Sequence, residues 1–288
     1  MNDRILETKG LKKAFGPKEV LKGLNLSAER GEVVGILGRN GSGKTTLFSI
    51  LLDLMSADGG SAEILGLRPD GSGRLRGLIG YVPEKPAFHG FMTAREVLEF
   101  RARFFRHWDM AKALDLCRKL ELDPASRVSA MSKGNLAKLA WIAATAHNPE
   151  LLLLDEPTSG LDYLVRDHIL NGLIHELTEG GRTIIVANHR MGEMGGILDR
   201  VCVLKDGAIA ANHNAAFLTE EVFRAAARLE SPVSLPAGVV ALGGGGALRE
   251  FAVFGRENLE RLKLDPAFAG AEISPLSLED SFKVLLGE

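Results

Sequence analysis

A glycine-rich loop carries the clearest chemical signal in the sequence. The stretch GRNGSGKT, residues 38–45, follows the apolar run EVVGILG and precedes the amphipathic segment KTTLFSILLDLM. Glycines let successive backbone N–H groups converge on one anion, and a helix that begins near Gly43 adds its positive end. The spacing G-x-x-x-x-G-K-[ST] between a strand and a helix is typical of a phosphate-binding loop, although a chance glycine-rich turn is the simpler alternative.

Two adjacent carboxylates form the second signal. Asp155 and Glu156 follow the run LLLLD directly, where a buried strand is expected to end. Buried carboxylates need a counter-charge, and a Mg²⁺ ion with phosphates would supply one to Asp155. Glu156 is then placed to orient and deprotonate an attacking water. The alternative is a capping Asp and a solvated Glu before Pro157.

The elements that position these residues alternate between strands and helices. Buried strands are expected at 32–38, 77–83 and 151–155, further strands at 182–188 and at 200–210 with a turn at Asp206–Gly207, and helices at 44–55 and about 163–178. Such alternation predicts a mostly parallel sheet covered by helices, whose C-terminal edge is the usual place for a ligand. The stretch 93–147 interrupts the alternation and predicts an inserted helical subdomain, opened by a capping box at Thr93 and Glu96.

The end of the chain has a different character. The segment AAFLTEEVFRAAARLE, residues 215–230, is expected to be helical, and residues 247–287 to form a small α/β appendage. The domains expected are therefore 1–214, with a helical subdomain over about 88–147, and a C-terminal extension over 215–288. No chemistry is evident in the extension.

Composition and charge exclude several classes of protein. Hydrophobic residues make up 45% of 288 residues, so a large core is expected, and a formal net charge of -2 argues against a general nucleic-acid binder. Cys117 and Cys202 lack metal-ligand spacing and are expected to be reduced. No apolar run is long enough to span a bilayer, and no signal peptide is evident, so a cytoplasmic protein is expected.

These motifs together resemble the ATP-binding cassette (ABC) ATPases. GRNGSGKT resembles the family's first nucleotide motif (Walker A), and LLLLDEPTSGLD its second motif with the following loop. MSKGN, residues 131–135, stands where the signature Leu-Ser-Gly-Gly-Gln is expected. VANHR supplies the switch histidine and YVPE the glutamine loop. The resemblance covers about residues 4–212. It implies a P-loop nucleoside triphosphatase fold with an antiparallel N-terminal β subdomain.

The resemblance also implies roles for individual residues. Phe15 would stack on adenine, and the phosphates would be held by Gly38, Arg39, Asn40, Gly41, Ser42, Gly43, Lys44, Thr45 and Thr46. Thr45, Glu84 and Asp155 would hold Mg²⁺, while Glu156, His189 and Lys44 would act in catalysis. Ser132 and Gly134 would contact the γ-phosphate bound by an opposite subunit, and Asp162 would meet that subunit. The implied cofactors are ATP and Mg²⁺.

Three departures from the family pattern bear on turnover. Glu84 replaces Gln and adds negative charge beside a triphosphate, while Lys133 and Asn135 replace Gly and Gln of the signature. The backbone N–H of Gly134 would still be able to donate a hydrogen bond to phosphate. These changes leave open a weak or asymmetric site, and a homodimer or a heterodimer of ATPase subunits.

The resemblance implies the ATP-hydrolysing subunit of a transporter, working on the inner face of a membrane through a separate membrane protein. The forms YVPE and SKGN, with the end of the chain, resemble bacterial ABC-2-type exporters. The segment 85–108, rich in Phe and Arg, is a candidate docking groove for that partner or a packed amphipathic helix. The alternatives are a soluble ABC ATPase and an ATP-dependent switch with little hydrolysis.

Overall fold

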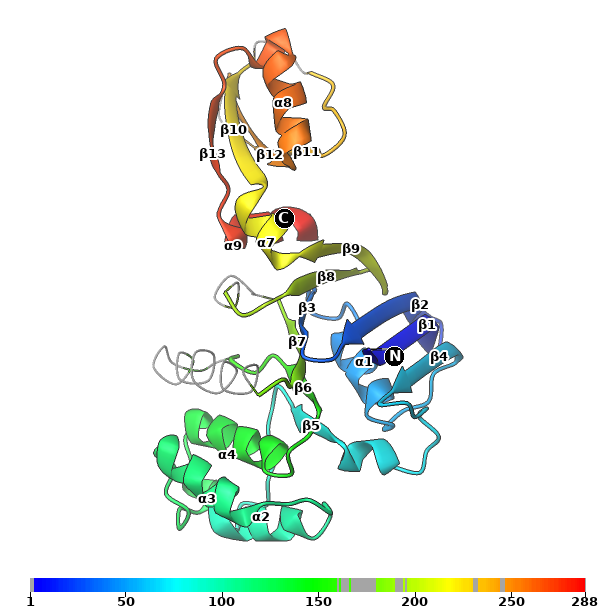
Figure 1. Ribbon diagram of the computed structural model, residues 1–288, viewed down its shortest axis with the longest axis vertical. Coiled ribbons are helices and arrows are strands. Elements are labelled where there is room, and N and C mark those ends of the chain that lie inside the picture. Colours follow the sequence, from blue (N-terminus) through cyan, green and yellow to red (C-terminus); the bar gives the residue numbers. More distant parts are fainter. Residues whose placement is uncertain are drawn as a thin grey trace.

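The computed structural model describes residues 3–159, 161, 166, 180–189, 194, 196–229, 233–243 and 247–287. Figure 1 shows a central sheet with a helical subdomain at one end of the molecule and the C-terminal extension at the other. Of the helix expected over about 163–178, the structure describes only Arg166.

The central sheet has the strand order β5-β6-β7-β3-β8-β9. Its strands are β5 (Ile79–Val82), β6 (Leu151–Asp155), β7 (Thr183–Asn188), β3 (Val33–Leu37), β8 (Arg200–Lys205) and β9 (Ala208–Asn214). All neighbours are parallel except β8 and β9. Strands β3, β6 and β7 are buried along their whole length, as expected of parallel strands covered on both faces. Register pairs Leu37 with Asn188 and Asp155 with Ala187, so the ends of these strands lie at one edge.

Alternate residues of these strands point to opposite faces of the sheet and pack into two separate cores. On one face Leu152, Leu154 and Ile184 pack with the helical subdomain. On the other face Leu151 and Leu153 pack with α1 and the N-terminal sheet. The period of two along a strand therefore divides each buried run between the two layers.

The N-terminal β subdomain is a three-stranded antiparallel sheet in the order β2-β1-β4. Its strands are β1 (Arg4–Phe15), β2 (Lys18–Glu29) and β4 (Gly59–Ile64), and α1 (Lys44–Leu51) packs between it and the central sheet. Helix α1 is shorter than predicted. Asp53 adopts a left-handed φ of 56°, and its carboxylate accepts the N–H groups of Gly71 and Gly73, which turns the chain away.

The helical subdomain is inserted between β5 and β6. It contains α2 (Ala94–Ala102), α3 (Met110–Lys119), the short 3₁₀ turn η2 (Val128–Ala130) and α4 (Lys133–Thr145). A separate 3₁₀ turn, η1 (Arg74–Gly77), lies before β5 and outside the subdomain. The predicted capping box at Thr93 and Glu96 opens α2. Trp141 is fully buried in the middle of α4, which anchors that helix against the central sheet.

The C-terminal extension differs from the prediction at its start. Residues 215–230 were expected to be helical, but α7 (Ala215–Glu220) ends early and β10 (Val222–Arg228) follows. Phe223, Ala225 and Ala227 pack into a small core of their own, and pairing with β12 and β13 satisfies the backbone. Tertiary packing thus outweighs the helical preference of an alanine-rich run.

The rest of the extension completes a four-stranded antiparallel sheet in the order β11-β12-β10-β13. Its remaining elements are β11 (Val239–Gly243), β12 (Leu248–Phe254), α8 (Arg256–Leu264), η5 (Pro266–Phe268), β13 (Glu272–Pro275) and α9 (Leu278–Leu286). Helices α7 and α9 return to the central sheet, and Leu218 and Phe282 join the same core as Val201 and Val203 of β8. Among the described residues, no helix has the length and apolar character needed to cross a membrane.

Candidate functional site

The loop between β3 and α1 has the backbone of an anion cradle. Gly41 and Gly43 have φ values of 81° and 111°, which side-chain-bearing residues rarely adopt. A Cβ on Gly43 would lie 2.9 Å from Leu21 Cδ2, so the position also lacks space. The loop therefore needs its glycines, and it delivers the chain to the N-terminus of α1.

Lys44, the first residue of α1, is held inside the loop. Its side chain is 6% exposed, and Nζ donates to the carbonyls of Gly38 at 2.6 Å and Arg39 at 3.2 Å. The same Nζ lies 3.4 Å from Glu156 Oε1, close enough for an ion pair. The ammonium group thus occupies the centre of the cradle, where a phosphate would compete for it.

Asp155 ends β6 directly beside α1. Thr45 Oγ1 donates to Asp155 Oδ2 at 2.9 Å, while Oδ1 is buried without a hydrogen-bond partner. Burial raises the pKa of Asp155, and the negative charges of Glu156 and Glu84 raise it further against the opposing effects of Thr45 and Lys44. A bound cation would offset the cost of burying a carboxylate that has one oxygen without a partner.

Glu156 is fixed by its backbone as well as by its side chain. It has a left-handed φ of 49°, and its N–H donates to the carbonyl of Ala187 on β7 at 2.8 Å. Oε2 lies 2.7 Å from His189 Nδ1. The strained backbone turns the carboxylate back over the strand ends, between Lys44 and His189.

These residues line one pocket with a volume of about 320 Å³. Its walls are Lys18, Val20, Asn40, Gly41, Gly43, Lys44, Thr45, Thr46, Glu84, Asp155 and Glu156. The structure therefore brings most of the predicted phosphate, metal and catalytic residues together. Lys18 and Val20 were not predicted; the Gly16–Pro17 turn that precedes them was the available signal that β2 returns toward the loop.

Other predicted residues lie apart from this pocket. Phe15, at the end of β1, is 46% exposed and has the Lys13 ammonium 5.8 Å from its ring centre, but it does not line the pocket. Ser132 caps α4 by accepting the N–H of Asn135, and neither it nor Gly134 lines the pocket. Asp162 lies outside the described residues. The roles of these four residues stay predictions, as do the roles predicted for the residues that line the pocket and for His189.

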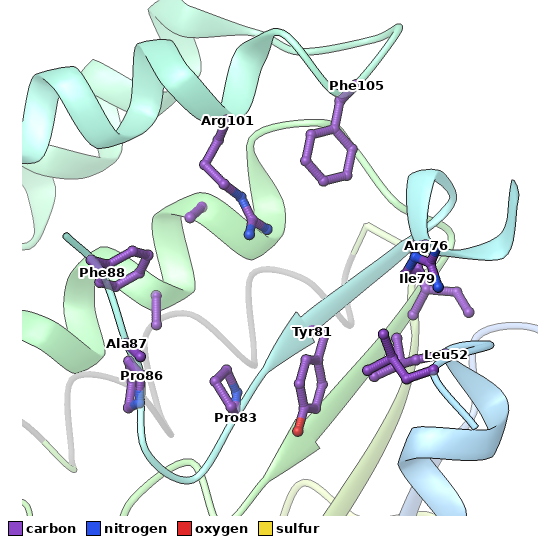
Figure 2. Close-up of a pocket in the computed structure, with 13 residues that line it drawn as sticks. Leu52, Arg76, Ile79, Tyr81, Pro83, Pro86, Ala87, Phe88, Arg101 and Phe105 are labelled. Carbon is purple, nitrogen blue, oxygen red and sulfur yellow. The ribbon is translucent and has the colours of Figure 1, made fainter. Parts of the chain in front are cut away.

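A second cavity lies between the central sheet and the helical subdomain, beyond Glu84. Figure 2 shows it bordered by β5, the chain that follows β5, and α2. Its volume is about 230 Å³. Its walls are Leu52, Leu54, Arg76, Ile79, Tyr81, Pro83, Pro86, Ala87, Phe88, Arg101, Phe105, Ala140 and Ala143. The groove is mostly apolar and includes part of the segment 85–108 for which docking was predicted.

The sequence is similar to ATP-binding proteins of transporters. A family model described as ABC transporter matches residues 21–159. An uncharacterized ABC transporter ATP-binding protein of Methanocaldococcus jannaschii is 34% identical over 207 residues, which are 70% of this chain and 74% of that protein. The Nod factor export ATP-binding protein I of Rhizobium sp. (strain N33) is 34% identical over 227 residues, 77% of this chain and 74% of that protein.

Solved structures share the fold. An ATP-binding subunit of an ABC transporter superposes with a TM-score of 0.68 at 28% identity, covering 74% of this chain and 91% of that one. The dimeric post-hydrolysis state of the ATP-binding cassette MJ0796, bound to ADP and Pi, gives 0.66 at 26% identity and covers 73% and 98%. The predicted fold class and the predicted family resemblance are confirmed.

Proposed function

Because the chain belongs to the ABC transporter family, as its ATP-binding and ATP-hydrolysing subunit, we propose that the pocket at the ends of β3 and β6 is its ATP site. The observation that supports this most is the state of Lys44. A buried ammonium held by two carbonyls and a carboxylate is poised to exchange those weaker partners for the β- and γ-phosphates. Backbone N–H groups of the loop and the Thr46 side chain would hold the remaining phosphate oxygens.

The residues present fit a Mg²⁺ ion beside the triphosphate. Asp155 Oδ1 is buried and lacks a partner, and Thr45 Oγ1 adjoins the same carboxylate. Thr45, Asp155 and Glu84 would hold the ion, and it would supply charge neutralisation at the transferring phosphoryl group.

Hydrolysis needs a base beside the γ-phosphate. Glu156 is 6% exposed and is held at the strand ends, so its carboxylate is placed to orient and deprotonate water once Lys44 turns to phosphate. His189 contacts the other carboxylate oxygen. Its imidazole would keep Glu156 in position and contact the γ-phosphate.

We also infer that two ATPase subunits close head to tail on ATP. Ser132 and Gly134 begin α4 away from the pocket of their own chain, so their use at a phosphate requires a second subunit. The N-terminus of α4 offers N–H groups and a helix dipole to an anion. The solved dimer of the cassette MJ0796 supports such an arrangement. The Phe15 ring and Asp162 are proposed to meet adenine and the second subunit.

The partner in the membrane is proposed to dock in the groove of Figure 2, within residues 85–108. The groove begins beside Glu84, so a change at the metal would pass directly to Pro86 and Phe88. The chain would lie on the cytoplasmic face of the membrane, and export is the proposed direction, supported by the similar Nod factor export protein. The division at residue 214 is also a proposal. The separate core beneath α8 supports it, while α7 and α9 of the extension pack on β8.

The test uses purified protein, ATP and Mg²⁺. The parent should release phosphate. Glu156→Gln should release none and should form an ATP-dependent dimer on gel filtration, because the variant still binds ATP but its amide side chain cannot take a proton from water. Asn135 and Lys133 in the signature favour one rival, a switch that closes but barely hydrolyses. Equal dimer formation in the parent and negligible phosphate release would favour that rival. A monomer in both proteins at saturating ATP would contradict the head-to-tail site.

A further inference from the structure

The docking groove is cationic although it is mostly apolar. Two of its wall residues, Arg76 and Arg101, carry charge, and none of its wall residues is Asp or Glu. Figure 2 shows Arg101 reaching from α2 and Arg76 lying on the far side, near Ile79. Arg76 is satisfied by the carbonyl of Asp53 at 2.7 Å. Arg101 is the residue that lacks an equivalent contact.

The Arg101 guanidinium is mostly withdrawn from water and has no anionic partner. Its Nε is buried without a hydrogen-bond partner, and in the described residues no carboxylate pairs with it. Its Cζ lies 5.3 Å from the centre of the Phe105 ring. Burial lowers the pKa of Arg101. An unpaired, partly buried charge is costly.

The neighbours of Arg101 preserve this condition rather than relieve it. Phe105 stacks on His147, with ring centroids 4.2 Å apart. Burial lowers the pKa of His147 to about 4, so His147 is neutral at physiological pH and adds no second positive charge beside Arg101. Arg200 shows the contrasting case: it is also partly buried, but it binds both carboxylate oxygens of Glu32 and the carbonyl of Ser27.

We propose that Arg101 recognises a carboxylate on the membrane partner, carried by a short apolar segment that seats in this groove. The inference rests on the proposed docking function and adds the chemistry of the occupant. The segment would place aliphatic or aromatic side chains on Phe88, Tyr81 and the prolines, and one Asp or Glu beside Arg101. Charge complementarity then sets the register of docking, since a buried guanidinium gains most from a carboxylate that shields it from water.

A protein segment fits this groove better than a lipid surface does. Arg101 lines a cavity of about 230 Å³ whose walls include the rings of Phe88 and Phe105, so a ligand reaches it by entering a concave site. A lipid surface, in contrast, presents a layer of polar headgroups, which contacts the protruding parts of a protein more readily than the inside of a cavity. The lipid alternative is nevertheless separable, because a phosphate headgroup would bind Arg101 in the absence of any partner protein.

The experiment compares three variants of the full chain, each tagged and purified with its membrane subunit from native membranes. Arg101→Met removes the charge and Arg101→Lys keeps it, while Arg106→Met removes an exposed charge of the same segment. Recovery of the membrane subunit should fall roughly tenfold or more for Arg101→Met, because a charge-assisted contact is lost, and should be unchanged for Arg106→Met. The isolated Arg101→Met chain should melt no lower than the parent, since an unpaired charge is removed.

Carbodiimide treatment of the Arg101→Lys complex should link the introduced amine to one Asp or Glu of the membrane subunit, identified by mass spectrometry. Equal recovery in all variants and no such link would overturn the inference while leaving the docking function intact. Failure of the parent to recover any membrane subunit would instead refute the docking function, and the inference with it. Arg101-dependent flotation of the isolated chain with phosphatidylserine vesicles would assign the site to lipid and overturn the inference.

Discussion

His189 Nδ1 lies 2.7 Å from Glu156 Oε2, while Lys44 Nζ lies 3.4 Å from the other oxygen of the same carboxylate. His189 directly follows β7, Glu156 directly follows β6, and Lys44 is the first residue of α1, so the three elements meet at one carboxylate. The carboxylate proposed as the base is clamped from two sides before ATP binds. When Lys44 turns to phosphate, His189 remains as the contact that holds Glu156 in place.

This arrangement predicts that His189→Ala lowers turnover much more than ATP binding. We expect kcat to fall by roughly 10²-fold or more, because a base that loses its fixed orientation loses most of its advantage. The change in the Kd for ATP should be within a few-fold. Phosphate release and calorimetric titration measure the two quantities. A variant with a normal kcat would show that the contact with Glu156 is incidental.

Glu84 predicts an unusually strong dependence of ATP binding on metal. It lines the pocket with Asp155 and Glu156, so three carboxylates face the site of a polyanion. Glu84→Gln should tighten binding of ATP in EDTA by roughly tenfold, because one repulsive charge is removed at short range. Binding of ATP with Mg²⁺ should change less.

Calorimetric titration of ATP in EDTA and in Mg²⁺ provides this measurement for the parent and the variant. Glu63→Gln is the matched control, since Glu63 is an exposed carboxylate on β4, outside the pocket. An equal change in both media would mean that Glu84 acts on folding of the loop rather than on charge.

His147 predicts a loss of stability in acid. Its folded pKa is about 4 against an ordinary value of 6.5, so the unfolded chain takes up the proton first as the pH falls. The folded state is therefore favoured above pH 6.5, and up to roughly 3 kcal/mol is lost as the pH falls from 6.5 toward 4. In His147→Phe, the urea midpoint should depend less on pH over this interval than it does in the parent. His107→Phe, which changes an exposed histidine, should keep the parent's dependence.

The close approach of β5 and α4 leaves no room for a side chain at Gly80. A Cβ on Gly80 would lie 2.4 Å from the carbonyl oxygen of Ala144 and 2.9 Å from Leu152 Cδ2. Gly80→Ala should lower the free energy of unfolding by at least 1–3 kcal/mol, roughly the cost of overpacking a core. Gly77→Ala is the control, since a Cβ there would meet no atom within 4 Å. Equal urea midpoints for the two variants would contradict the close approach seen here.

The sequence was most informative where short-range physics decides the structure. Continuous apolar runs predicted β3, β6 and β7, and the glycine spacing predicted the loop before α1, because burial and backbone freedom are local demands. The prediction of a helix over residues 215–230 was wrong for the opposite reason. The strand β10 depends on pairing with β12 and β13, which lie far from it in the sequence. Lys18, Val20 and the unpaired Arg101 depend on segments far apart in sequence, which no local pattern records.

The last helix of the chain also bears on how the protein is made. Phe282 and Leu286 of α9 share a core with Val201 and Val203 of β8. During synthesis β8 leaves the ribosome before α9 does, so β8 carries an uncovered apolar strip until residues 278–286 have emerged. Chaperone protection of that strip during synthesis, and aggregation of chains truncated before residue 278, follow from this delay.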